Sequence, residues 1–261
     1  MQRLALGVEY LGGAYCGWQF QNHCDSIQAR LQTALGFIAD TPIEVFCAGR
    51  TDTGVNAIGQ VVHFVSETER PLKAWLQGTN TQLPDDIRVS WVKPVPPSFH
   101  ARFSATSRQY RYVIFNRSVR SAVLTGRVTW ERIELDEGLM HRAAQHLIGE
   151  HDFSSFRASE CQAAHARRNV TKLNVSRRGD MVFIDIEANA FLHHMVRNIA
   201  GTLMQIGRGE APVDWTAELL TLKDRTRATV TAPANGLYFV NALYPDEFDI
   251  PRATLNELVW Q

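Results

Sequence analysis

The chain has 261 residues, of which 45% are hydrophobic, and its 27 basic residues balance 27 acidic ones. This composition is typical of a globular protein with an ample core, and the length fits one large domain or two of moderate size. No apolar run approaches the roughly 20 residues that a membrane-spanning helix needs, and the chain opens directly into a strand-like pattern. We therefore expect a cytoplasmic protein with no membrane partner.

The four cysteines lie far apart in the sequence and form no C-x-x-C pair: Cys16, Cys24, Cys47 and Cys161. This spacing predicts neither a zinc ribbon nor a dithiol redox motif. We expect all of them to be free, reduced thiols, as is usual in a cytosolic protein.

The first half of the chain alternates apolar patterns of strand and helix period. Strands are expected over 4–11, 44–48, 60–65 and 87–95, and helices over 27–35 and 71–79. Ser26 is a good N-cap for the first helix, and Pro71 suits the first turn of the second. The order strand, helix, strand, strand, helix, strand is that of a ferredoxin-like split βαβ unit. His63, inside an apolar strand, is expected to be a satisfied core or edge histidine.

The second half also mixes the two patterns. Strands are expected over 108–116 and from Gly236 on, a hairpin over 170–175 and 181–186, and helices from Asp136 to Gly149, from Leu192 and over 213–223. Tyr110 and Tyr112 share one face of the first of these strands. We predict an α+β protein with an N-terminal domain over 1–105 and a C-terminal domain over 106–261.

The segment from Cys47 to Ala57 draws attention because glycines flank Arg50 and Asp52 just after a buried strand. Glycines let the backbone turn sharply and let a ligand approach closely, and such loops often carry function. A surface turn in which Asp52 bonds its own backbone explains the same pattern. The segment alone leaves both interpretations open.

Basic residues are segregated along the neutral chain. No acidic residue lies between Asp86 and Glu131, and a second basic window runs from Arg167 to Arg178. Such stretches, interleaved with aromatic residues, suit a polyanion-binding face. They equally suit solvated faces that distant acidic residues neutralise.

An apolar helical stripe runs from Leu192 to Leu203, and Arg197 lies next to it. A partly buried arginine needs a carboxylate, because an unpaired buried charge costs several kcal/mol. Spacing leaves Asp52, Asp185 and Glu187 as candidates. The adjacent histidines at 193 and 194 point to different faces, so we expect no metal site there.

With these pieces in place, the sequence resembles the tRNA pseudouridine synthase A (TruA) family over nearly its whole length. Each motif is weak alone, but their order and spacing are specific. The matching motifs are Glu9-Tyr10, Gly17-Trp18-Gln19, Ala48-Gly49-Arg50-Thr51-Asp52, Gln60-Val61-Val62-His63-Phe64, Phe99-His100-Ala101-Arg102-Phe103, Tyr110-Arg111-Tyr112, Phe153-Ser154-Ser155-Phe156-Arg157, His193-His194-Met195-Val196-Arg197-Asn198 and Gly236-Leu237.

The resemblance implies isomerisation of uridines 38, 39 and 40 in the tRNA anticodon stem-loop to pseudouridine. It implies two ferredoxin-like halves that form one extended, mainly antiparallel mixed sheet flanked by helices, with the active-site cleft between the halves. It also implies a homodimer that binds tRNA and needs neither cofactor nor metal.

The resemblance further implies a role for each matching residue. Asp52 matches the catalytic aspartate, which we expect to act as nucleophile, and Arg50 matches the arginine that assists base flipping. Tyr110 matches the tyrosine that stacks on the target base, Arg197 the arginine that pairs with the catalytic carboxylate, and Leu237 an apolar residue that lines the pocket. The residues that match RNA-contacting segments are Phe99, His100, Ala101, Arg102, Phe103, Glu160, Cys161 and Gln162.

The sequence departs from the family pattern at two places. Thr53 and Asn56 stand where the family usually has Ala and His, and His165-Ala166 stands where it tends to have Ser or Thr followed by Pro. These departures are the support for an alternative, a non-catalytic tRNA-binding or chaperone module on the same fold. A hydrolase with paired carboxylates would need a second acid near Asp52.

Overall fold

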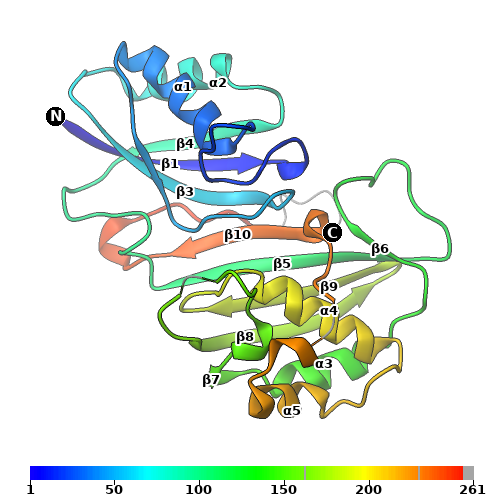
Figure 1. Cartoon of the computed structure of the whole chain (residues 1–261). Helices are drawn as coiled ribbons and strands as arrows, with labels where there is room; N and C mark the ends of the chain where they lie inside the picture. Colours follow the sequence, from blue (N-terminus) through cyan, green and yellow to red (C-terminus); the bar gives the residue numbers. More distant parts are fainter. Residues whose placement is uncertain (162, 229, 255–261) are drawn as a thin grey trace. The chain divides into compact units, whose positions relative to one another are not determined.

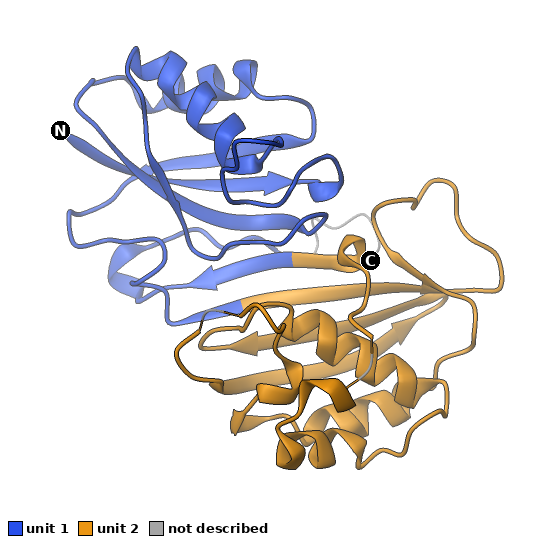
Figure 2. Cartoon of the chain, viewed as in Figure 1, with its two compact units in different colours: residues 1–108, 239–261 blue, residues 109–238 orange. Residues whose placement is uncertain are grey.

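A computed structural model describes residues 1–161, 163–228 and 230–254. The chain divides into two compact units (Figure 2). Unit 1 holds residues 1–108 and the described residues from 239 on, and unit 2 holds residues 109–238. The sequence-based division placed the boundary between 105 and 106 and kept the C-terminal residues in the second half. They belong with unit 1 because the last strand, β10, neighbours β3 there.

Unit 1 has the element order of a split βαβ unit (Figure 1). Its strands and helices are β1 (Gln2–Tyr10), α1 (Ile27–Ala39), β2 (Val45–Cys47), β3 (Asn56–Ser66), α2 (Thr79–Gln82) and β4 (Ile87–Pro94). The strand order is β4-β1-β3, with β2 paired to β3. Strand β1 pairs antiparallel with both of its neighbours.

The helices of unit 1 follow from their sequence signals. The Ser26 side chain caps α1 by accepting a hydrogen bond from the Ala29 amide at 3.3 Å, and Ile27 and Leu31 on the inner face are fully buried. The second helical segment begins directly after Pro71, as predicted, but its predicted end at residue 79 was wrong. The helical segment runs on to Gln82, and a π-helical turn at Ala74–Gly78 places the buried Trp75 edge-on to a neighbouring phenylalanine.

Unit 2 also mixes strands and helices, with additional short elements. Its elements are β5 (Ser107–Asn116), β6 (Thr129–Glu131), α3 (Glu137–Gln145), β7 (Gly149–Asp152), β8 (Arg167–Arg178), β9 (Met181–Ala188), α4 (Met195–Gly207), α5 (Trp215–Leu222) and β10 (Leu237–Leu243). The first two residues of β5 belong to unit 1, as do the last five of β10. The strand order is β5-β9-β8-β7, and β6 runs parallel to β5.

Side-chain capping sets the start of α3. Asp136 accepts a hydrogen bond from the Leu139 amide at 2.8 Å, as its position in the sequence predicted. The prediction that Gly149 ends this helix was wrong. The helix ends at Gln145, and Gly149 opens the short strand β7 with a φ of 105°. Gly179, with a φ of 56°, forms the predicted hairpin between β8 and β9.

Among the described residues, ten strands form one mixed sheet that helices flank, so the predicted α+β class is confirmed. The β5–β6 pairing is parallel, whereas the pairings β1–β3, β1–β4, β2–β3, β7–β8 and β8–β9 are antiparallel. No helix among residues 1–161, 163–228 and 230–254 has both the length and the hydropathy that crossing a bilayer requires.

Cys16 and Cys24 form a disulfide, so the expectation of four free thiols was wrong for this pair. The loop between them folds back on itself, because the Cys16 amide donates to the Asp25 carbonyl at 2.9 Å and Gln21 bridges to Cys24. The two Cα atoms are therefore 6.3 Å apart, within the span of a disulfide. Cys47 and Cys161 are free.

Candidate functional site

The loop between β2 and β3 carries Arg50 and Asp52, and its entry is fixed by β3. The Ala48 amide donates to the Val61 carbonyl at 2.8 Å. The fully buried Gln60 side chain donates to the Gly49 carbonyl at 2.6 Å and accepts from the Gly49 amide at 3.4 Å. An amide that bonds both backbone groups of one residue holds the chain at that point in a single orientation.

Thr51 anchors the middle of the loop. Its side chain is buried and shares a 2.8 Å hydrogen bond with the Tyr10 hydroxyl. Its carbonyl accepts from the Trp18 amide at 3.0 Å. Burial raises the pKa of Tyr10, so this phenol keeps its proton at neutral pH. The residue before Asp52 is therefore held from two sides.

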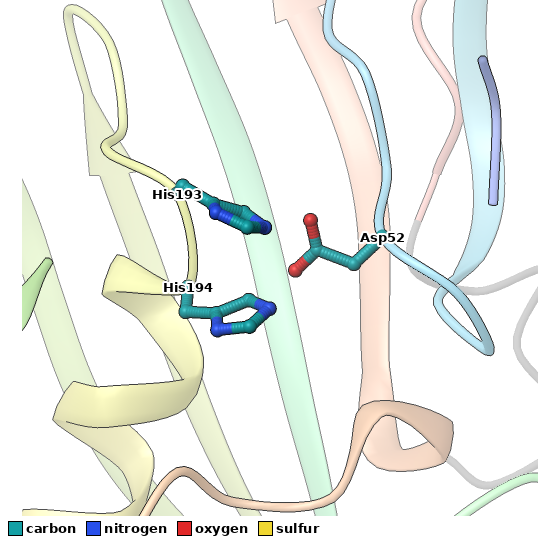
Figure 3. Close-up of side chains that lie close together, drawn as sticks. All are labelled: Asp52, His193 and His194. Atoms are coloured by element: carbon teal, nitrogen blue, oxygen red, sulfur yellow. The ribbon is translucent and has the colours of Figure 1, made fainter. Parts of the chain in front are cut away.

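Asp52 and Arg50 remain accessible on either side of the buried Thr51. The Asp52 carbonyl accepts from the Val55 amide at 3.1 Å and closes a tight turn, in which Gly54 has a φ of 79°. The Asp52 side chain is half-buried and points away from its own loop in Figure 3, and Arg50 is exposed. The loop thus presents a carboxylate and a cation on a fixed backbone.

Asn56 closes the loop at its far end. Its side chain is fully buried, and its Oδ1 accepts from the Gly12 amide at 2.9 Å. The residue that departs from the family pattern therefore supports the loop, since it ties the start of β3 to the segment after β1.

The segment from Phe99 to Phe103 contains both buried residues, which form its framework, and residues that lie at the surface. Phe99 and Ala101 are fully buried, so they shape the segment from inside. Arg102 is exposed, and the Phe103 ring is 74% exposed with the Arg102 guanidinium carbon 5.4 Å from its centre. The half-buried His100 packs against Phe103 with ring centres 4.4 Å apart. These three side chains are the ones that a ligand can reach.

His63 is a buried histidine with a hydrogen-bond partner, as its place in an apolar strand predicted, and it supports this segment. It is 2% exposed, and its Nδ1 accepts from the Ala101 amide at 3.2 Å. Burial, together with the neighbouring His100 and Arg3, lowers the pKa of His63 to about 4. The ring is therefore neutral at physiological pH and serves as a hydrogen-bond acceptor.

Arg108 joins the two loops of unit 1. Its guanidinium donates to the Ala48 carbonyl at 3.2 Å, and the same nitrogen donates to the Arg102 carbonyl at 2.5 Å. One cation thus ties the entry of the Asp52 loop to the segment that presents Arg102 and Phe103. We did not identify this role from the sequence, where Arg108 is one of several basic residues.

In unit 2, Tyr110 lies on β5 with its ring packed edge to face on Phe191. The ring centres are 5.0 Å apart and the planes meet at 83°. Edge-to-face packing fixes the plane of an aromatic ring. Phe191 lies two residues before the His193–Asn198 motif, and nothing in the sequence related it to Tyr110.

Arg197, in the first turn of α4, is half-buried and bound to the chain that leads into β10. Its Nε donates to the Ala232 carbonyl at 2.8 Å, and the Ala232 amide donates back to the Arg197 carbonyl at 3.2 Å. Leu237, at the start of β10, is 5% exposed. The Tyr112 hydroxyl donates to the Pro233 carbonyl at 2.9 Å and holds the connecting segment from β5. Of the other acids that spacing allowed, Asp185 pairs with Arg111 at 2.6 Å.

His193 and His194 lie on the turn that precedes α4 (Figure 3). Their ring centres are 4.0 Å apart, and His194 has a φ of 61°, which is uncommon for a residue with a side chain. The His193 carbonyl accepts from the Ala158 amide at 2.9 Å. This bond attaches the segment that carries the exposed Glu160 and the half-buried Cys161. Gln162 lies outside the described residues.

Many of the segregated basic residues are neutralised by acids distant in the sequence. Arg111 forms an ion pair with Asp185, and Arg177 donates to Glu137 at 2.7 Å. For these arginines, the interpretation that distant acidic residues neutralise the basic stretches is therefore confirmed. Within either unit alone, the described residues bring no three His, Cys, Asp or Glu side chains close enough to share one ion.

A family model described as tRNA pseudouridine synthase matches residues 7–104 and 143–245. The chain belongs to this family. It is 66% identical to the tRNA pseudouridine synthase A of Hydrogenovibrio crunogenus, over all of both chains. It is 53% identical to that of Shewanella frigidimarina, over 98% of each. A solved archaeal box H/ACA Nop10–Cbf5 complex matches 77% of this chain and 44% of its own with 10% identity and a TM-score of 0.35, which is too low to support an argument.

Membership of this family confirms the prediction of an enzyme, since pseudouridine synthases are isomerases. The family resemblance stated from sequence motifs is likewise confirmed.

Proposed function

We propose that this chain isomerises uridines 38, 39 and 40 in the anticodon stem-loop of tRNA, with Asp52 as the nucleophile. The observation that carries this proposal is the held loop, in which buried partners fix the residues around Asp52 while its carboxylate stays accessible. A fixed nucleophile needs little reorganisation when it reacts.

The proposed reaction rearranges bonds within one nucleotide. The bond from N1 of uracil to C1′ of the ribose breaks, the base turns, and C5 bonds to C1′. C5 releases its proton and N1 gains one, so atoms balance without an oxidant or cofactor. A base cannot turn inside a stack, so it has to leave the helix first, at a cost of a few kcal/mol.

We assign the remaining site residues by the resemblance. Arg50, exposed beside Asp52, holds the space that the flipped base leaves. Tyr110 stacks on the target base, and its packing on Phe191 supports this role because it fixes the plane of the phenol ring. Arg197 pairs with the carboxylate of Asp52, and Leu237 contributes the apolar wall that keeps water away.

We further propose that tRNA is gripped by two segments. In the first, Phe99 and Ala101 form the frame, and His100, Arg102 and Phe103 contact the RNA. The second contains Glu160, Cys161 and Gln162. Exposed aromatic rings beside arginines suit stacking on bases and contacts to phosphates. The same proposal includes a homodimer in the cytoplasm with no cofactor or metal.

Pseudouridine mapping of tRNAs incubated with the purified protein tests the assignment. We expect new pseudouridine at positions 38 to 40 with the wild type and none with Asp52→Ala, which still binds tRNA. Release of label from C5-tritiated uridine gives the rate. Full release by Asp52→Ala would remove the catalytic role of this residue and leave the non-catalytic RNA-binding alternative. Asn56 was one of the two departures that favoured this alternative. It no longer favours it, because the Asn56 side chain anchors the loop.

A further inference from the structure

Unit 2 has a surface cavity of about 270 Å³ beside the segment that leads to Glu160. Its polar and charged lining residues are Ser154, Arg157, Ser159, Lys223, Asp224 and Arg225. Small-molecule sites usually enclose roughly 300–1,000 Å³ and are mostly apolar. This cavity is smaller and polar, so it suits a compact charged group better than a whole cofactor.

The lining is electropositive. Three cations face one carboxylate, that of Asp224. Both the amide and the hydroxyl of Thr226 donate to one oxygen of Asp224, at 2.9 and 2.7 Å, so this acid caps its own turn. Lys223 lies 3.9 Å from Asp152, at the outer limit of an ion pair. The Arg157 guanidinium has no hydrogen bond or ion pair within the described ranges.

A buried frame holds the cavity wall. Asn198 is fully buried, and its amide nitrogen donates to the Phe156 carbonyl at 2.7 Å. Its oxygen accepts from the Arg225 guanidinium at 3.1 Å. The Ser155 hydroxyl donates to the Leu219 carbonyl at 2.6 Å and ties the same turn to α5. The backbone that carries Arg157 and the side chain of Arg225 are thus positioned from inside.

We propose that this cavity binds a backbone phosphate of the RNA substrate, with Arg157 and Lys223 as the main contacts. Guanidinium and ammonium groups are the usual phosphate ligands of proteins, and the hydroxyls of Ser154 and Ser159 add hydrogen-bonding groups. The cavity adjoins the segment of Glu160 and Cys161, which we assigned to tRNA above. This subsite therefore rests on the proposed function and extends it along the RNA backbone.

The salt dependence of tRNA binding tests the subsite. Each phosphate contact contributes roughly 0.7–0.9 to the slope of log K against log salt concentration. Over the tenfold range from 0.1 to 1 M salt, one contact therefore changes the binding constant by a factor of about 5 to 8. We expect Arg157→Gln and Lys223→Gln each to lower the slope by about that amount. Binding of tRNA should weaken about five- to eight-fold at 0.1 M salt.

Two controls accompany the variants. Arg157→Lys keeps the charge and should restore the slope. Arg142→Gln removes an exposed arginine from the last turn of α3, away from the cavity lining, and should leave the slope unchanged. Thermal unfolding of each variant checks that it remains folded.

Equal slopes for the wild type and Arg157→Gln would overturn the subsite. A second arm replaces potassium chloride with potassium phosphate at constant ionic strength. Saturable phosphate binding that Arg157→Gln abolishes, with no change in the tRNA slope, would assign the cavity to a free anion and also overturn the proposal. Pseudouridine mapping is independent of both measurements, so failure of the proposed function can be told apart from failure of the subsite.

Discussion

Replacing Gly17 with alanine tests whether neighbouring backbone holds the Asp52 loop in the position that the proposed reaction requires. Gly17 has a φ of +88°, and an added Cβ would lie 2.7 Å from the Thr51 carbonyl oxygen and 2.9 Å from the Asp52 carbonyl carbon. Ordinary contacts begin at 3.4 Å, so the loop would have to move by 3.4 − 2.7, or about 0.7 Å. Both obstructing atoms belong to backbone, which cannot rotate away.

Two effects are expected from Gly17→Ala. The left-handed backbone costs an ordinary residue about 1–2 kcal/mol, which lowers Tm by roughly 2–8 °C for a chain of this size. Displacement of reacting groups by about 1 Å reduces rates roughly 10²-fold. We therefore expect single-turnover release of label from C5-tritiated uridine in tRNA to slow by about 10- to 100-fold.

Gly126→Ala is the matched control. Gly126 has a φ of +76°, and an added Cβ would meet no atom within 4 Å. This variant should show the same loss of Tm and normal turnover. If folded Gly17→Ala turns over at the wild-type rate, or if both variants slow equally, the reasoning that contact with Gly17 positions Asp52 is refuted.

Two further predictions concern buried groups of unit 1. Asn56→Ala leaves the Gly12 amide without its side-chain acceptor, and we expect a loss of about 1–3 kcal/mol of unfolding free energy, measured by urea denaturation; an unchanged midpoint would contradict the anchoring role. The pKa of His63 is about 4 in the folded state against 6.5 when unfolded, so the stability that its neutral form contributes is complete above pH 6.5 and is lost as pH falls toward 4. Between these values Tm should fall less steeply in His63→Gln than in the wild type, and equal slopes would argue against the assignment.

Local sequence signals predicted the helix starts well, because a capping residue acts on its nearest neighbours. Ser26 and Asp136 both bond the amide three residues ahead. The features that we did not predict are those that leave no local signal in the sequence. Strands β6 and β7 have three and four residues, too few to reveal a period of two. The disulfide forms because the loop between Cys16 and Cys24 folds back, which their spacing alone does not encode.

The motifs identified the residues proposed for chemistry, but they did not indicate what holds them. Tyr10 bonds Thr51 across 41 positions of sequence, and Arg108 bonds Ala48 across 60. Hydrogen bonds between residues so distant depend on which strands become neighbours, and a single sequence carries no local pattern for that. The supporting residues of the Asp52 loop therefore required the three-dimensional structure.

The chemistry of these supports bears on how pH should act on the enzyme. Burial raises the pKa of Tyr10 well above its usual range and that of Cys47 to about 12, and it lowers that of His63 to about 4. None of these three groups changes charge between about pH 5 and 9, so the bond of Tyr10 to Thr51 and that of His63 to the Ala101 amide stay constant across that range. A change of turnover between pH 5 and 9 would therefore have to arise outside these three groups, for example at the reacting groups or in RNA binding.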